Sequence, residues 1–170
     1  MGASNTIDLA ALRLRPGEGR RIEQPLGEDS LSYGAQGYVV DPGVIALVEV
    51  SKIPGGHALH LCFTGRLTGP CMRCLDEAKI EVEVEAREVD QPGAGEELDS
   101  PYVEGEELRL RDWAHDSLAL ALPVQLVCRP DCAGLCPVCG ESLNDAEPGA
   151  HDHPSEPDPR WDKLRELKLD

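Results

Sequence analysis

The chain has 170 residues, a formal net charge of −16, and 41% hydrophobic but only 4% aromatic residues. Its length allows one sizeable domain with a small appendage, and its core must be aliphatic because few large rings are available. Almost all of the net charge, −15, falls in residues 81–170, where 23 acidic side chains face 8 basic ones. A broad basic surface for nucleic acid is therefore excluded, and the second half should repel RNA or attract basic proteins.

No apolar run approaches the ~20 residues that a membrane-spanning helix needs. Residues 1–30 lack the apolar stretch of a secretory signal peptide. These patterns predict a cytoplasmic protein with no membrane partner. In a reducing compartment, paired cysteines act as metal ligands or redox groups more often than they form disulfides.

Residues 1–30 are predicted to form an N-terminal arm. Its four arginines surround a proline and two glycines, a composition typical of a loop: Arg13, Arg15, Arg20 and Arg21. We expect a solvated, mobile arm, with a small contact for RNA or a partner protein as the alternative.

Residues 31–127 are predicted to form a β-rich core. Apolar, β-branched stretches at 37–40, 44–53 and 58–63, with a Pro-Gly-Gly turn before the last, favour antiparallel strands. Residues 80–86 alternate apolar residues with glutamates, which predicts a strand with one buried and one acidic face. That acidic face is either simply solvated or a docking face for a basic protein.

Two helices are predicted. Asp112 is a plausible N-cap for a helix over about 113–122 that ends before Pro123, and Asp158-Pro159 would begin a short terminal helix. The predicted fold class is therefore α+β: an antiparallel β-sheet or partial barrel with one central helix. A zinc-knuckle segment over 128–170 would carry the terminal helix.

The cysteines and histidines that could bind a metal ion occur in four close pairs along the sequence, which is enough for two complete zinc sites. The eight candidate ligands are Cys71, Cys74, Cys128, Cys132, Cys136, Cys139, His151 and His153. Pro137 would stiffen the second C-x-x-C turn, and Gly140 permits the positive φ that closes it. The seventh cysteine, Cys62, is expected to be a small buried residue of a strand.

Spacing leaves two pairings open. In the local scheme, the four cysteines of 128–139 hold one zinc ion. In the other scheme, Cys71 and Cys74 join Cys128 and Cys132, while Cys136 and Cys139 join both histidines; we favour it because it uses every donor. Two histidines only two residues apart can share an ion only where the chain bends. Arg73 and Arg129 lie between ligands of the first group and could donate to its thiolates.

No arrangement of catalytic residues is recognisable. The sequence has no Gly-rich phosphate loop, no G-x-S-x-G, and no zinc motif with an adjacent glutamate as general base. Sites with four protein ligands are structural, whereas catalytic zinc keeps a position open for water. We therefore expect no enzymatic activity. The alternative is a thiol redox sensor or oxidoreductase that uses one C-x-x-C pair.

Several segments together resemble the YceD family of large ribosomal RNA subunit accumulation proteins. They are Cys71-Met-Arg-Cys74-Leu75, the helix end Leu118–Pro123, the run Cys128–Asn144, and Asp158–Leu164. The resemblance spans roughly residues 30–169, and relatives carry Cys-x-Cys where this chain has His151-Asp-His153, a swap that keeps zinc ligation. It implies a bacterial or plastid cytoplasmic protein without assigned catalytic activity and with a role in large-subunit ribosomal RNA accumulation.

These observations lead to one functional hypothesis. We expect a zinc-stabilised factor for ribosome assembly with one or two zinc ions and no small-molecule substrate. Its partner would be a basic ribosomal protein or a pre-ribosomal particle, bound through the acidic half. Any direct RNA contact would be weak and confined to the N-terminal arginines.

Overall fold

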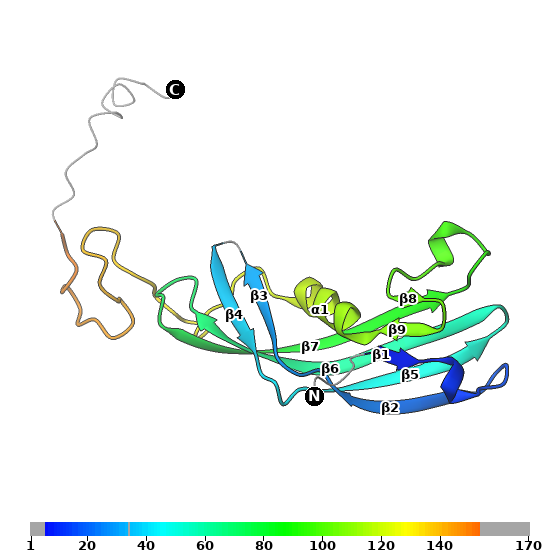
Figure 1. The fold of residues 1–170 in the computed structure, drawn as a ribbon. Coiled ribbons are helices and arrows are strands. Elements are labelled where there is room, and N and C mark those ends of the chain that lie inside the picture. The colour runs from blue at the N-terminus through cyan, green and yellow to red at the C-terminus, as the bar shows by residue number, and fades with distance from the viewer. Residues whose placement is uncertain (1–5, 34, 154–170) are drawn as a thin grey trace, which may run out of the picture.

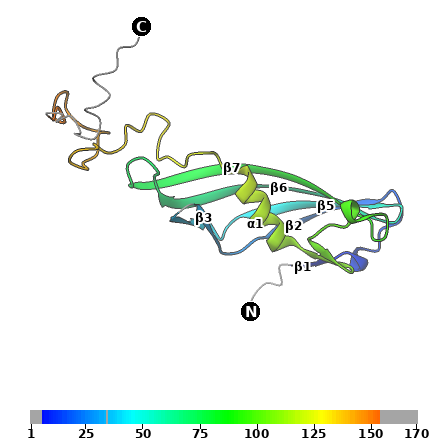
Figure 2. The ribbon, with the colours of Figure 1, turned by 90° about the horizontal axis from the view of Figure 1, so that it is seen from above.

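The structure is a computed structural model that describes residues 6–33 and 35–153. Its main element is an open antiparallel sheet of six strands: β2 (Gly19–Pro25), β3 (Asp29–Tyr33), β4 (Gln36–Val40), β5 (Ile45–Ile53), β6 (Gly56–Pro70) and β7 (Glu77–Asp90). One face of this long, curved sheet carries the helix α1 (Leu110–Ala121), which crosses it obliquely (Figures 1 and 2).

A smaller sheet lies beside the helix. It consists of β1 (Thr6–Asp8), β9 (Glu107–Arg109) and β8 (Val103–Glu104) in that order. Two short 3-10 helices, η1 (Ala10–Leu12) and η2 (Glu96–Leu98), occupy connections. Ile7 and Leu108, which pair across β1 and β9, belong to the same buried core as the main sheet.

Strand β6 organises the main sheet because it pairs along both edges. Strand β7 follows one edge over all 14 of its residues, whereas β5 and β4 share the other edge end to end. Apolar side chains alternate as the sequence predicts: Leu59 and Leu61 are buried on β6, and Val82 and Val84 on β7. The glutamates between them on β7 are exposed, which confirms the acidic face.

Helix α1 sits close to the sheet where β6 has no side chain. A Cβ atom at Gly65 would lie 2.6 Å from Cδ1 of Leu118, so only glycine allows this approach. Trp113 is 1% exposed, and its ring stacks on Tyr102 with 6.2 Å between centroids. The helix therefore closes the core over the middle of the sheet, away from both ends.

The predicted helix start is wrong by three residues. The helix begins at Leu110, its N-cap position is Arg109, and Asp112 lies inside the first turn. There its carboxylate accepts a hydrogen bond from Nη1 of Arg109 at 2.9 Å and complements the positive end of the helix dipole. A short strand runs directly into the helix, so no separate capping residue marks the boundary.

The prediction of a mobile N-terminal arm is also wrong over residues 6–30. Strand β1 pairs with β9, and β2 pairs with β5 over Gly19–Pro25. Because β2 is an edge strand with few apolar side chains, its pattern resembles a loop. The boundaries near residues 31 and 128 stay predictions.

The α+β class, with a mostly antiparallel sheet and one helix, is confirmed. The terminal helix predicted from Asp158 lies outside the described residues. Within residues 6–33 and 35–153, no helix is long and apolar enough to cross a membrane.

Candidate metal centres

The first C-x-x-C forms the turn of the β6–β7 hairpin, at one end of the long sheet (Figure 1). The N–H of Cys71 donates to the carbonyl of Asp76 at 2.7 Å, and the N–H of Leu75 donates to the carbonyl of Cys71 at 3.0 Å. The backbone N–H of Arg73 points at Sγ of Cys71, 3.4 Å away. This turn therefore directs two sulfurs and a backbone donor toward one point.

The chain after α1 brings two more sulfurs to that point. Leu126 lies against the turn, because the N–H of Met72 donates to its carbonyl at 2.8 Å. Sγ of Cys132 then lies 3.8 Å from Sγ of Cys71, and Sγ of Cys128 lies 3.7 Å from Sγ of Cys74. All four sulfurs are within 4.8 Å of one another, and we call them group one.

Group one has the dimensions of a zinc site. Four sulfurs at 2.3 Å from a tetrahedral zinc ion lie about 3.8 Å apart, whereas disulfide sulfurs lie about 2.05 Å apart. The observed 3.7 and 3.8 Å match the first geometry. Cys71 and Cys132 are 0% and 3% exposed, and Ala78, Val127 and Leu135 pack around them. Cys74 is also buried, and Cys128 is the one member of the group that is partly exposed.

The second C-x-x-C repeats the same turn within 136–141. The N–H of Cys136 donates to the carbonyl of Glu141 at 2.8 Å, and the N–H of Gly140 donates to the carbonyl of Cys136 at 2.9 Å. Gly140 adopts φ 75°, which glycine does without strain, whereas Leu75 adopts φ 66° at the equivalent position of the first turn.

Both histidines reach this second turn because the chain bends between them. The N–H of His153 donates to the carbonyl of His151 at 3.0 Å, and that of Asp152 donates to Gly149 at 3.2 Å. Nδ1 of His151 lies 3.3 Å from Sγ of Cys139. The two sulfurs and two ring nitrogens lie within 4.8 Å of one another, and we call them group two.

A buried ring nitrogen in group two lacks a hydrogen-bond partner. Nε2 of His153 has no partner among the described residues, although it is shielded from solvent. Such a group is costly unless it binds something. Thiolate sulfur and imidazole nitrogen are the donors that zinc prefers, so both groups fit a metal ion chemically.

The first cysteine of each turn is the more acidic. Burial alone would raise the pKa of Cys71, but surrounding backbone N–H groups outweigh it and hold the pKa at about 6. The N–H groups of Cys139 and Val138 lower the pKa of Cys136 to about 7. Burial raises the pKa of Cys74 to about 12, and its hydrogen bond with Cys71 adds to this. A metal ion must displace the remaining protons, so its binding depends on pH.

The structure thus brings together all eight predicted donors, in the pairing that uses every one of them. The wholly local four-cysteine grouping is wrong. The predicted contact of two arginine side chains with sulfur is also wrong. The guanidinium of Arg73 donates to the carbonyl of Cys132 at 3.0 Å and to Oε1 of Gln125 at 2.9 Å. That of Arg129 donates to the carbonyl of Asn144 at 3.0 Å.

Gln125 and Asn144 are supporting residues that the sequence pattern did not indicate. Oδ1 of Asn144 accepts the N–H of Ala133 at 2.8 Å, just after the last cysteine of group one. Their partners lie 11 to 52 residues away along the chain. The position of Asn144 shortly after the second turn is a usable signal, whereas nothing marks Gln125.

Residues 59–168 match the model of a family described as "Large ribosomal RNA subunit accumulation protein YceD". The chain belongs to the YceD family. All eight donors fall within this match, whereas strands β1 to β5 precede it.

The mycobacterial relatives of this YceD chain carry no functional description. The uncharacterized protein Rv2926c of Mycobacterium tuberculosis is 32% identical over 170 residues, which cover 95% of this chain and 80% of the relative. The uncharacterized protein ML1660 of Mycobacterium leprae is 32% identical over 115 residues, covering 61% and 51% respectively. No solved structure matches the chain.

Cys62, the remaining cysteine of this YceD chain, is half-buried on β6. Its sulfur lies 3.3 Å from Nε2 of His60. Burial raises the pKa of Cys62, and the carboxylates of Glu85 and Glu49 raise it further. This thiol is therefore poorly suited to nucleophilic chemistry.

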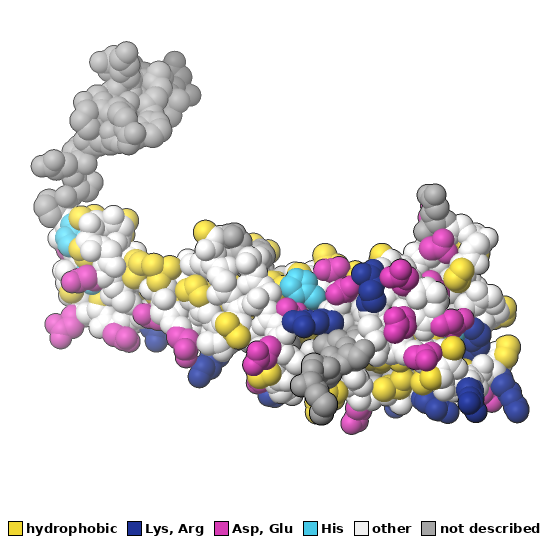
Figure 3. All heavy atoms as spheres, viewed as in Figure 1, with side chains coloured by type: hydrophobic (Ala, Val, Ile, Leu, Met, Phe, Trp, Pro, Cys, Tyr) yellow, Lys and Arg dark blue, Asp and Glu magenta, His cyan; other side chains and the backbone are white. Residues whose placement is uncertain are grey.

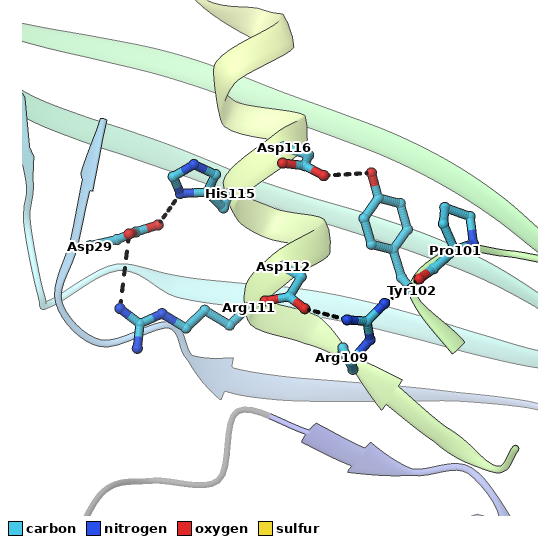
Figure 4. Close-up of a pocket in the computed structure, with 8 residues that line it drawn as sticks. All are labelled: Asp29, Pro101, Tyr102, Arg109, Arg111, Asp112, His115 and Asp116. Carbon is cyan, nitrogen blue, oxygen red and sulfur yellow. Dashed lines mark hydrogen bonds and ion pairs between the residues drawn. The ribbon is translucent and has the colours of Figure 1, made fainter. Parts of the chain in front are cut away.

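A polar hollow of about 400 Å³ lies between α1, the start of β3 and the segment before β8 (Figure 4). Its charged groups bond to one another. His115 Nδ1 lies 2.7 Å from Asp29, and the hydroxyl of Tyr102 donates to Asp116 at 3.1 Å. Arg111 donates to the backbone carbonyl of Glu28 at 2.7 Å. These contacts fasten the helix to its neighbours and account for the polar groups that line the hollow.

Proposed function

We propose that this YceD-family chain is a non-enzymatic, zinc-stabilised factor that supports large-subunit ribosomal RNA accumulation or ribosome assembly. The observation that carries the proposal is the presence of two complete four-donor groups inside the matched region. The family description supplies the connection to ribosomal RNA. Zinc would act as a cross-link that holds the chain in shape.

A structural role for zinc is supported by the number of protein donors. Each group offers four side chains, which fills a tetrahedral ion and leaves no position for a catalytic water. Group one is also buried among apolar side chains.

The thiol redox alternative has weaker support. In group one all four sulfurs lie within 4.8 Å of one another, so the two sulfurs of the C-x-x-C each face a sulfur of another segment, Cys71 with Cys132 and Cys74 with Cys128. The C-x-x-C turns lie in hairpins, whereas redox pairs open a helix. Alkylation of the zinc-loaded chain tests this: protected thiols support the structural role, and rapid modification of either C-x-x-C supports the redox role.

The proposed partner is a basic ribosomal protein or a pre-ribosomal particle that contains one. The acidic strand face, with Glu81 and Glu83 exposed, and the −15 charge of residues 81–170 favour a cationic surface. This attraction is screened by salt.

Two measurements test the proposal. Native mass spectrometry of the intact chain should count two zinc ions. Purified zinc-loaded chain should co-sediment with large-subunit precursor particles at low salt and dissociate as salt is raised. A zinc-loaded chain that sediments with no ribosomal component at low salt contradicts the proposal.

A further inference from the structure

The basic side chains of the described residues are not evenly distributed. Most of them have a carboxylate within 4.0 Å: Arg21, Arg66, Lys79, Arg87, Arg109, Arg111 and Arg129. Arg73 is used in the hydrogen bonds beside group one. The only others over residues 6–33 and 35–153 are Arg13, Arg15, Arg20 and Lys52, and none of them has an acidic partner within that range. We call these four residues the basic corner.

The backbone holds the basic corner together. The N–H of Gly17 donates to the carbonyl of Lys52 at 2.8 Å, and the N–H of Lys52 donates to the carbonyl of Glu18 at 2.8 Å. The N–H of Arg15 donates to the Glu18 carboxylate at 2.9 Å, and the N–H of Arg13 closes the 3-10 turn on Ala10 at 3.1 Å. Arg13 and Arg15 therefore stand on a hydrogen-bonded loop, and Arg20 and Lys52 on the adjacent ends of β2 and β5.

The basic corner contrasts with the rest of a strongly acidic molecule. Dark blue side chains gather at the lower right of Figure 3, over the adjacent ends of β2 and β5, whereas acidic and basic side chains are interspersed over the rest of that view. A hollow of about 200 Å³ opens there, lined by Gly19, Arg20, Ser51 and the ion pair of Arg21 with Glu49. The corner lies at the opposite end of the long sheet from the metal groups (Figure 1).

We infer that the basic corner binds the phosphate backbone of RNA, an inference that rests on the proposed function. Guanidinium groups bind phosphate oxygens bidentately, and Arg13, Arg15 and Arg20 have theirs free for this. Acidic surfaces elsewhere on residues 6–33 and 35–153 repel RNA, so within that part of the chain the proposed contact is the basic corner. In a particle that contains both RNA and basic protein, the basic corner would bind the RNA. The acidic end that carries the metal groups would bind the protein.

A matched pair of triple variants tests the basic corner. One carries Arg13→Gln, Arg15→Gln and Arg20→Gln; the control carries Arg66→Gln, Lys79→Gln and Arg87→Gln, which changes the net charge equally at cations that already have partners. The probe is a fluorescein-labelled single-stranded RNA oligonucleotide, read by anisotropy with zinc-loaded full chain at low salt. We expect the corner triple to weaken binding about 10-fold or more and to flatten its salt dependence, and the control to change affinity about 2-fold at most.

Three results overturn the inference: no binding by the unmodified chain, equal losses in both triples, or displacement of RNA by polyaspartate as effective as by unlabelled RNA. The last would mean that the corner selects acidic polypeptide instead. Co-sedimentation with large-subunit precursor particles, run on the same variants, separates this inference from the proposed function. If the corner triple still sediments like the control, the corner is not the RNA contact while the proposed function stands. If no variant sediments, the proposed function itself fails.

Discussion

The two four-donor groups use the same turn to connect very different lengths of chain. Group one joins the β6–β7 hairpin to the segment after α1, so that Cys71 and Cys132 are 61 residues apart. In group two Cys139 and His151 are only 12 residues apart. An ion in group one would therefore close a loop around the whole helix, whereas an ion in group two would order a local hairpin.

Burial follows the same division. Three of the four cysteines of group one are buried, whereas Cys136 is the one buried member of group two. The comparison teaches that, with metal bound, one short motif would cross-link distant segments at one place and order a local hairpin at the other. The following predictions test this difference, beginning with the largest effect.

Replacing a ligand of group one should damage the whole fold. Cys71→Ser removes a cross-link over 61 residues, which the loop-closure relation values at about 4 kcal/mol. Chemical denaturation of the zinc-loaded variant, measured by tryptophan fluorescence to which the buried Trp113 contributes, should show a large loss of stability. The matched variant Cys139→Ser should leave that core transition nearly unchanged. Equal losses of stability in the two variants would show that groups one and two do not differ in their structural roles.

Acid should release the metal of group two before that of group one. The pKa of Cys136 is held at about 7 and that of Cys71 at about 6. A depressed pKa stabilises the thiolate form until the pH falls through that value, so in the metal-free groups Cys136 is protonated at a higher pH than Cys71. Imidazole binds metal only when it is neutral, which adds to the effect. Zinc release during acid titration should show two steps, and a single step for both ions would contradict this order.

Replacing Arg73, beside group one, and Arg129, beside group two, should change the stability of different parts of the chain. Arg73→Gln removes hydrogen bonds to Cys132 and Gln125 and should lower the free energy of unfolding by about 1 kcal/mol, since the side chain is exposed. Arg129→Gln removes a bond to Asn144 in the hairpin of group two. In this variant, hydrogen exchange should be faster in residues 133–144, and the unfolding transition of the core should be unchanged. Faster exchange in β6 and β7 as well would show that the two groups are not independent.

The smallest expected effect concerns the turn residue itself. Leu75 holds a left-handed conformation that costs an L-residue about 1–2 kcal/mol, and it is 59% exposed. Leu75→Gly should raise stability by about 0.5–1 kcal/mol, after the extra backbone entropy of glycine is subtracted. Gly140→Leu should do the reverse at group two. Thermal unfolding measures both, and a destabilising Leu75→Gly would show that the Leu75 side chain contributes contacts that outweigh its strain.

Local patterns in the sequence predicted the donors and the central strands. Alternation of apolar residues with glutamates identified β7, and C-x-x-C spacing identified both turns before any fold was known. Spacing alone left two pairings open, because the approach of Cys71 to Cys132 depends on how α1 and the chain after it return to the β6–β7 turn. Long-range contacts of that kind have no local signature.

The same reason explains the errors. Strand β2 carries four charged or amide side chains among its seven residues and is held by its neighbour β5 rather than by its own pattern. The start of α1 was missed because β9 runs into it without a separate cap. Gln125 supports group one only through Arg73, which lies 52 residues earlier. Each of these features depends on tertiary partners.

X-ray absorption of the zinc-loaded chain tests the central claim most directly, because it reports the atoms bound to the metal. With one ion held by four sulfurs and one by two sulfurs and two nitrogens, the average zinc environment should contain three sulfurs at about 2.3 Å and one nitrogen at about 2.0 Å. A chain that binds two ions with this average carries both groups as described. An environment of four sulfurs only, with a single ion bound, would contradict the account.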